Sequence, residues 1–162
     1  FRFDTATVQT APAVTKHVDV DPEAVAHFEA LISDPDQPVV LFALEWCEFA
    51  WGVKRLLTAL DVPFRAVHLD GPEFADPRRA TKVRRAMADR AGAVTIPQIF
   101  IGGTHLGGAT DTFDACDDGR LKAILGSVGI NADTDSISQA YSFLPKWIHP
   151  RGTSARTDPK AA

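Results

Sequence analysis

The sequence predicts an α/β fold, and two patterns carry this prediction. Apolar segments at residues 39–43 and 64–69 enclose a stretch at 47–60 whose apolar residues recur at helical spacing. This order is typical of a β-α-β unit, in which a right-handed crossover makes the two strands parallel. Residues 97–106 then place the pair Gly102-Gly103 between two short strand-like segments, which indicates a β-hairpin.

The elements before the hairpin have clear ends. Asp21-Pro22 predicts a helix start, since aspartate caps a helix and proline fits its first position, and residues 33–36 end that helix. The strand at 39–43 is uniformly apolar, so we expect it to be central and covered on both faces. The helix that follows stops at about Leu60, before Pro63, because the residue preceding a proline avoids helical ψ.

A third helix is predicted from Asp76-Pro77 to Gly92, again with a capping residue, a proline and a glycine stop. After the hairpin, Gly107-Gly108 lets the backbone turn sharply into one last helix. Thr110 or Asp111 is the expected cap of that helix.

The chain is predicted to have three parts. Residues 1–20 form an N-terminal arm or linker, residues 21–126 form the folded domain, and residues 127–162 form a C-terminal extension that is largely irregular and disordered at its end. An aromatic cluster at 141–148 is expected to dock on the domain or on a partner. The chain begins with Phe rather than Met, so we interpret it as a processed form or an excerpt of something longer.

Composition narrows the class of function. The net charge of −4 comes without a long basic run, so nucleic-acid binding is not suggested. No apolar run approaches the roughly 20 residues that cross a bilayer, and no signal-peptide pattern opens the chain, so we expect no membrane partner and a cytoplasmic location. Two cysteines are too few for a disulfide framework, and the five histidines show no metal-ligand spacing, so no metal site is predicted.

Cys47 lies where the first strand ends and the second helix begins. Unpaired backbone N–H groups and the positive end of the helix dipole meet at such a position. Both favour a thiolate, which is the nucleophilic form of cysteine. The sequence therefore predicts sulfur chemistry at Cys47.

Three motifs lie in register with these elements: Cys47-x-x-Ala50, Thr95-Ile96-Pro97 and Gly107-Gly108-x-Thr110-Asp111. Together they resemble the glutaredoxin family, whose motifs run C-x-x-C or C-x-x-S, T-V-P and G-G-x-x-D, over about residues 39–126. The resemblance implies a thioredoxin-like α/β fold of the glutaredoxin type, with a mixed four-stranded sheet and helices on both faces. It also implies an enzyme: a glutathione-dependent thiol–disulfide oxidoreductase that removes glutathione from proteins, or reduces disulfide-bonded proteins or small molecules.

The resemblance assigns roles to individual residues. Cys47 is the nucleophile that forms a mixed disulfide with the co-substrate glutathione, and a cis bond at Ile96–Pro97 would aim the Ile96 backbone at that ligand. The start of the last helix and Asp111 would bind the γ-glutamyl end. Arg84 either reaches the glycine carboxylate of glutathione or is simply solvated. The implied glutathione-binding set is Cys47, Phe49, Arg84, Thr95, Ile96, Pro97, Gly108, Ala109, Thr110 and Asp111.

Two departures from the family pattern bear on mechanism. Ala50 replaces the resolving thiol, so a disulfide between positions 47 and 50 is impossible; the protein is either naturally monothiol or altered to trap the mixed disulfide. Leu44 stands where the family usually has lysine, while Glu45 and Glu48 add negative charge.

Three further residues receive structural interpretations. We interpret Cys116 as a residue that fills the core rather than a resolving thiol. Trp51 is expected to pack in the domain, and Trp46 to border the site.

Two alternatives stay open beside this interpretation. One is a redox or binding module of a larger fused enzyme, for which residues 1–20 and 130–162 would be linkers or docking arms to an adjoining enzyme domain. The other is a glutathione-ligated iron–sulfur carrier, as in monothiol glutaredoxins with C-G-F-S. Glu48 replaces the small glycine of that motif, which counts against a cluster.

Overall fold

The computed structural model describes residues 20–148. Except for Val20, the predicted N-terminal arm lies outside these residues, as does the predicted disordered tail. Four strands form one sheet in the order β2 (Arg65–His68), β1 (Val39–Ala43), β3 (Gln98–Ile101) and β4 (Thr104–Gly107). Strands β1 and β2 are parallel and the other pairs are antiparallel, so the predicted mixed four-stranded sheet is confirmed.

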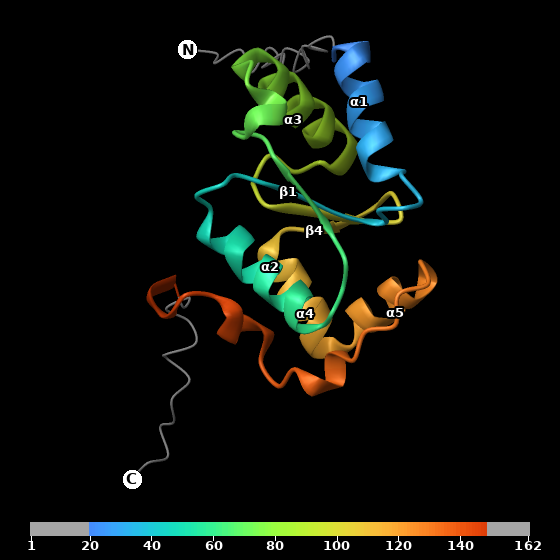
Figure 1. Cartoon of the computed structure of the whole chain (residues 1–162), viewed down its shortest axis with the longest axis vertical. Helices are drawn as coiled ribbons and strands as arrows, with labels where there is room; N and C mark the ends of the chain where they lie inside the picture. Colours follow the sequence, from blue (N-terminus) through green and yellow to red (C-terminus); the bar gives the residue numbers. More distant parts are fainter. Residues whose placement is uncertain (1–19, 149–162) are drawn as a thin grey trace, which may run out of the picture.

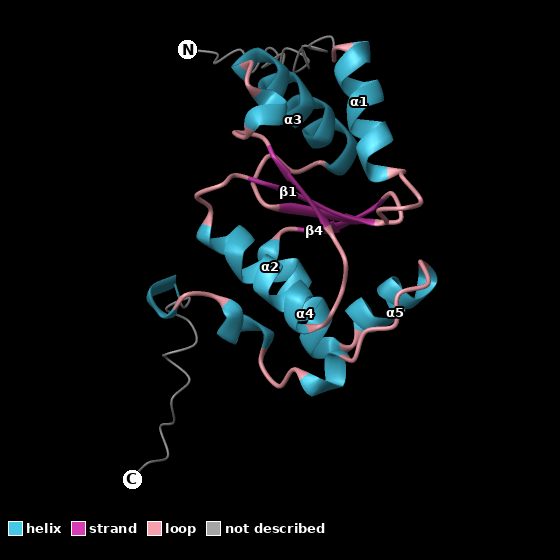
Figure 2. Ribbon diagram, in the orientation of Figure 1, coloured by secondary structure: helices cyan, strands magenta, loops and turns pink. Residues whose placement is uncertain are grey.

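Helices cover both faces of this sheet (Figure 1). On one face lie α1 (Pro22–Ile32) and α3 (Pro77–Ala91); on the other lie α2 (Glu48–Ala59), α4 (Ala109–Asp118) and α5 (Arg120–Ser127). Every residue of β1 is buried, and its side chains alternate between two hydrophobic cores, as the two-sided cover requires. Figure 2 shows the sheet as the layer between the two helix groups. None of the described helices is long and apolar enough to cross a membrane.

The predicted helix caps are confirmed for α1 and α3. The Asp21 carboxylate accepts the Glu23 N–H at 3.0 Å, and Asp76 accepts the Arg78 N–H at 3.0 Å. Gly92 ends α3 with φ at 70°, in the left-handed region that favours glycine.

The last helix differs from its prediction in two ways. Its cap is Gly108, not Thr110 or Asp111, and Asp111 instead lies at the third helical position and accepts the Gly108 N–H at 2.9 Å. The helix also breaks at Gly119, whose φ of 85° ends α4 and starts α5. One helix was predicted here, because the sequence pattern did not reveal that Gly119 adopts the left-handed conformation.

The described part of the C-terminal extension packs against α2 and α4. It contains three short 3-10 turns, η2 (Thr134–Ser136), η3 (Ala140–Phe143) and η4 (Lys146–Ile148). The Leu144 side chain is buried beside Gly52 of α2, where an added Cβ would lie 2.8 Å from Leu144 Cδ2. Glycine costs about 1 kcal/mol inside a helix, so its presence here is explained by this close approach.

Tyr141 anchors the extension through its ring and its hydroxyl. The ring packs on Phe113 with centroids 5.2 Å apart, and the hydroxyl donates to Asp114 Oδ1 at 2.7 Å. Burial raises the pKa of Tyr141 to about 12, and the Asp114 bond acts in the same direction.

We therefore expect the protein to lose stability between about pH 10 and pH 12. Below pH 10, the ordinary tyrosine pKa, both states hold the phenol proton. Above it the unfolded state loses the proton first, so the free energy of unfolding falls as the pH rises. Urea unfolding at several pH values would measure this slope. The variant Tyr141→Phe keeps the ring, so it should show a smaller slope; equal slopes in both proteins would contradict the prediction.

Candidate active site

Cys47 is the N-cap of α2, with φ −105° and ψ 113°, and its thiol makes no capping bond. The side chain is half-buried. Its Sγ lies 4.0 Å from the carbonyl oxygen of Ile96, which places the sulfur beside the Ile96–Pro97 peptide bond, and that bond is cis. The chain that leaves strand β1 thus places the sulfur at the start of α2, next to the backbone of the loop that contains Ile96 and Pro97.

A groove of about 410 Å³ opens beside this loop. Of the ten residues predicted to bind glutathione, eight line it: Phe49, Thr95, Ile96, Pro97, Gly108, Ala109, Thr110 and Asp111. Cys47 does not line the groove, but its sulfur lies 4.0 Å from the carbonyl oxygen of Ile96, which does. Three segments that are far apart in the sequence therefore form one concave site.

Arg84 is the predicted residue that the structure leaves at the edge. Its side chain is exposed, and Nη2 donates to the Val94 carbonyl oxygen at 3.3 Å, so it lies beside the loop that precedes Thr95 without lining the groove. In this arrangement the guanidinium braces the loop.

The β4–α4 turn depends on glycine. Gly107 has a φ of 132°, and a Cβ there would lie 2.6 Å from the Cβ of Asp111. Only glycine allows the Asp111 carboxylate to fold back onto the Gly108 N–H. This bond fixes the carboxylate at the mouth of the groove, where it presents negative charge.

Gln98 and His105 are groove residues with polar side chains that the sequence analysis missed. Gln98 is buried, and its amide nitrogen donates to the Thr95 carbonyl at 3.0 Å and to the Thr95 hydroxyl at 2.9 Å. Its amide oxygen lies 2.6 Å from His105 Nε2, so the imidazole donates there. Burial lowers the pKa of His105, which favours the neutral ring. The sequence did contain a signal for this site, because Gln98 is a polar residue within the otherwise apolar run at 97–101.

The loop before Cys47 is held by a second group that the sequence analysis missed. Both Asp70 carboxylate oxygens accept the Glu45 N–H, at 2.9 and 3.1 Å, and Trp51 Nε1 donates to the Glu45 carbonyl at 2.9 Å. Nearby, Lys54 Nζ lies 2.7 Å from His68 Nε2. Burial lowers the pKa of Lys54, although the charges of Glu45, Asp70 and Cys47 act in the opposite direction. The structure thus places a basic side chain, Lys54, in a region where Leu44 provides none.

Cys116 is buried in the core formed by α2, α4 and α5, as predicted. Burial raises the pKa of its thiol to about 11. At neutral pH this thiol is protonated and covered, so it is a poor nucleophile.

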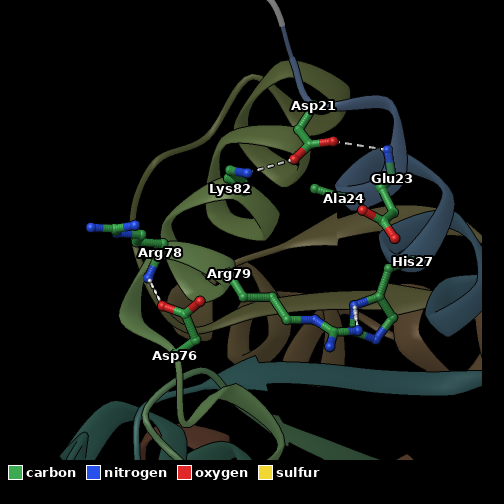
Figure 3. Close-up of a pocket in the computed structure, with 8 residues that line it drawn as sticks. All are labelled: Asp21, Glu23, Ala24, His27, Asp76, Arg78, Arg79 and Lys82. Carbon is green, nitrogen blue, oxygen red and sulfur yellow. Dashed lines mark hydrogen bonds and ion pairs between the residues drawn. The ribbon is translucent and has the colours of Figure 1, made fainter.

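A second hollow lies between α1 and α3, on the face of the sheet that is opposite to α2 (Figure 3). Its lining combines the carboxylates of Asp21, Glu23 and Asp76 with the cations Arg78, Arg79 and Lys82. The Lys82–Asp21 ion pair spans 2.8 Å, and it raises the pKa of Lys82 and lowers that of Asp21. The charges offset one another, and the hollow is remote from Cys47.

Comparisons with known proteins find a matching family and similar proteins. Residues 39–106 match the family model described as Glutaredoxin. The chain is 33% identical over 97 residues to Glutaredoxin-C6 of Oryza sativa subsp. japonica, covering 60% of this chain and 82% of the relative. It is 34% identical over 102 residues to Monothiol glutaredoxin-S12, chloroplastic, of Arabidopsis thaliana, covering 61% of this chain and 54% of the relative.

Solved structures show the same likeness. The crystal structure of wheat glutaredoxin has a TM-score of 0.60 and 35% identity, and the match covers 68% of this chain and 99% of that one. The buckwheat glutaredoxin–glutathione complex has a TM-score of 0.60 and 26% identity, over 68% of this chain and 94% of that one.

Proposed function

Because the chain belongs to the glutaredoxin family of glutathione-dependent thiol oxidoreductases and has its thioredoxin-like fold, we propose that Cys47 removes glutathione from protein or small-molecule mixed disulfides by a one-cysteine cycle. The observation that carries the proposal is the position of the Cys47 sulfur at a helix start, 4.0 Å from the Ile96 carbonyl and beside the groove.

The cycle has two exchange steps. The Cys47 thiolate attacks the glutathione sulfur of the substrate disulfide, the substrate sulfur leaves with the electron pair of the broken S–S bond, and water or buffer protonates it. The enzyme then carries a Cys47–glutathione disulfide. The thiolate of a second glutathione attacks that glutathione sulfur, releasing oxidised glutathione and the Cys47 thiolate. In total, the substrate disulfide is reduced to the substrate thiol, and the two glutathione units leave as oxidised glutathione.

The groove suits the glutathione half of the substrate. The Ile96 backbone offers an extended edge to the cysteinyl unit, which is the usual way a peptide adds to an exposed strand edge. The N-terminal N–H groups of α4 favour the γ-glutamyl carboxylate, and Asp111 favours its ammonium group. The likeness to the buckwheat glutaredoxin–glutathione complex supports glutathione as the ligand.

Ala50 determines which cycle is available. It is buried one turn into α2, where a dithiol enzyme has its second sulfur. Cys116 is buried and its raised pKa keeps it protonated, so it is poorly suited to resolve the Cys47 disulfide. The mixed disulfide therefore persists until glutathione arrives, whether Ala50 is natural or introduced.

Intact-mass spectrometry tests this function. After incubation with oxidised glutathione, we expect one glutathione adduct per chain in the wild type and in Cys116→Ser, and none in Cys47→Ser. In Ala50→Cys the adduct should be replaced by an internal disulfide that lowers the mass by two hydrogens. An adduct that survives in Cys47→Ser, or no adduct in the wild type, would overturn the proposal.

A further inference from the structure

Exposed apolar side chains gather round Cys47. Among the described residues, the large apolar side chains that remain exposed are Trp46 at 81%, Trp147 at 75%, Val94 at 72% and Phe49 at 38%. Trp46 and Phe49 flank the cysteine in sequence, and Val94 lies two residues before Ile96, which contacts the sulfur. Apolar surface of this kind, concentrated around one functional group, marks an interaction site.

The C-terminal extension supplies one of these side chains. Trp147 Nε1 donates to Glu48 Oε1 at 2.9 Å, which joins the end of the described chain to the first residue of α2. In Figure 1 the last turn of the extension runs beside the start of α2. The buried Leu144 and the backbone N–H of Ala140, which donates to Asp117 at 3.0 Å, anchor the segment that leads there. Trp147 is thus held next to the active-site helix, although 100 positions separate it from Cys47 in the sequence.

Trp46 and Trp147, here called the tryptophan rim, do not line the groove. Both are nevertheless positioned by the protein. Trp46 packs edge-on against Trp51 with centroids 6.0 Å apart, and Trp51 is itself bonded to the Glu45 carbonyl. A surface that is ordered before binding loses little entropy when a ligand arrives.

Carboxylates outnumber cations beside the tryptophan rim, where the basic side chains are Lys54, half-buried against His68, and the exposed Lys146, which precedes Trp147. Glu45 and Asp70 are exposed, and Glu48 accepts from Trp147. Two tryptophan faces beside carboxylates form an arrangement that attracts lysine or arginine, since a cation gains from the aromatic ring and from the acid together. An acidic peptide would be repelled by the same groups.

We infer that the tryptophan rim and Glu45 bind the polypeptide half of a glutathionylated protein whose cysteine is flanked by lysine or arginine. The inference rests on the proposed function, which places the glutathione half in the groove. The polypeptide half must then leave Cys47 over the surface outside the groove, and that surface carries the rim. The tryptophan rim contacts only the polypeptide half of the substrate, so the turnover of small mixed disulfides should not depend on it.

Two glutathionylated peptides of equal length test the inference, one with lysines on both sides of its cysteine and one with glutamates. We expect wild-type kcat/KM to be at least about tenfold higher for the lysine peptide. Trp147→Ala should lower kcat/KM for the lysine peptide about fivefold. Glu45→Gln should reduce the difference in kcat/KM between the lysine peptide and the glutamate peptide. Added salt should narrow it as well. Asp135→Asn, which removes only the exposed Lys122–Asp135 contact of the extension, is the matched control and should change neither value.

Two further readouts separate the possible failures. Turnover of the mixed disulfide of glutathione and 2-mercaptoethanol reports the proposed function alone. If that turnover is absent, fluorescence anisotropy still measures docking of the polypeptide half alone, with Cys47→Ser protein and analogues of both peptides that have serine in place of the glutathionylated cysteine. Equal kcat/KM for both peptides, or equal binding where turnover is absent, would overturn the inference. So would a Trp147→Ala effect on kcat/KM that is equal for lysine and glutamate peptides, or sedimentation that shows a dimer in the wild type and a monomer in Trp147→Ala.

Discussion

Cys47→Ser is expected to lower the rate of glutathione-dependent disulfide reduction by about a thousandfold or more. Serine keeps the size and the N-cap position of the side chain, but its hydroxyl stays protonated at neutral pH and does not form a mixed disulfide. The rate can be followed by coupling oxidised glutathione to NADPH consumption through glutathione reductase.

The control for this variant is Cys116→Ser, which removes the other thiol. Cys116 is buried and does not line the groove, so its loss should leave the rate within about twofold, with a modest cost in stability for placing a hydroxyl in the core. Substantial activity in Cys47→Ser, or its loss in Cys116→Ser, would move the chemistry to Cys116 and refute the assignment of the nucleophile.

Phe113→Ala should lower the free energy of unfolding by about 3–5 kcal/mol, the range for truncating a fully buried phenylalanine. Phe113 is 0% exposed, and its ring lies between Gly52 of α2 and Tyr141 of the extension. Its removal opens a cavity where α2, α4 and the extension meet. Urea unfolding monitored by circular dichroism would measure the change.

A matched truncation of an exposed residue separates this effect from the general cost of mutation. Val94 is 72% exposed, so Val94→Ala should change the free energy of unfolding by no more than about 0.5 kcal/mol. A loss of under 1 kcal/mol in Phe113→Ala would show that the extension does not close the core as described. Because Trp147 depends on the same segment, Phe113→Ala should also reduce any preference for the lysine peptide.

The sequence by itself determined the four strands, the first three helices and most of the groove. Capping residues, prolines and glycine stops act within a few residues, so Asp21, Asp76 and Gly92 marked helix ends that the structure confirms. The motifs around Cys47, Pro97 and Gly108 likewise marked three loops that meet in one site. Each of these signals is local, because a backbone conformation or a helix end depends mainly on its immediate neighbours.

Tertiary structure decided what depends on contacts between distant residues. The bond from Trp147 to Glu48 spans 99 positions, and no periodicity encodes which acid an indole will meet. The same holds for Asp70 on the Glu45 N–H and for the buried contact of Leu144 with Gly52. Such contacts arise only when packed elements bring unrelated segments within a few ångströms, so these contacts around the active-site helix became visible only in the folded chain.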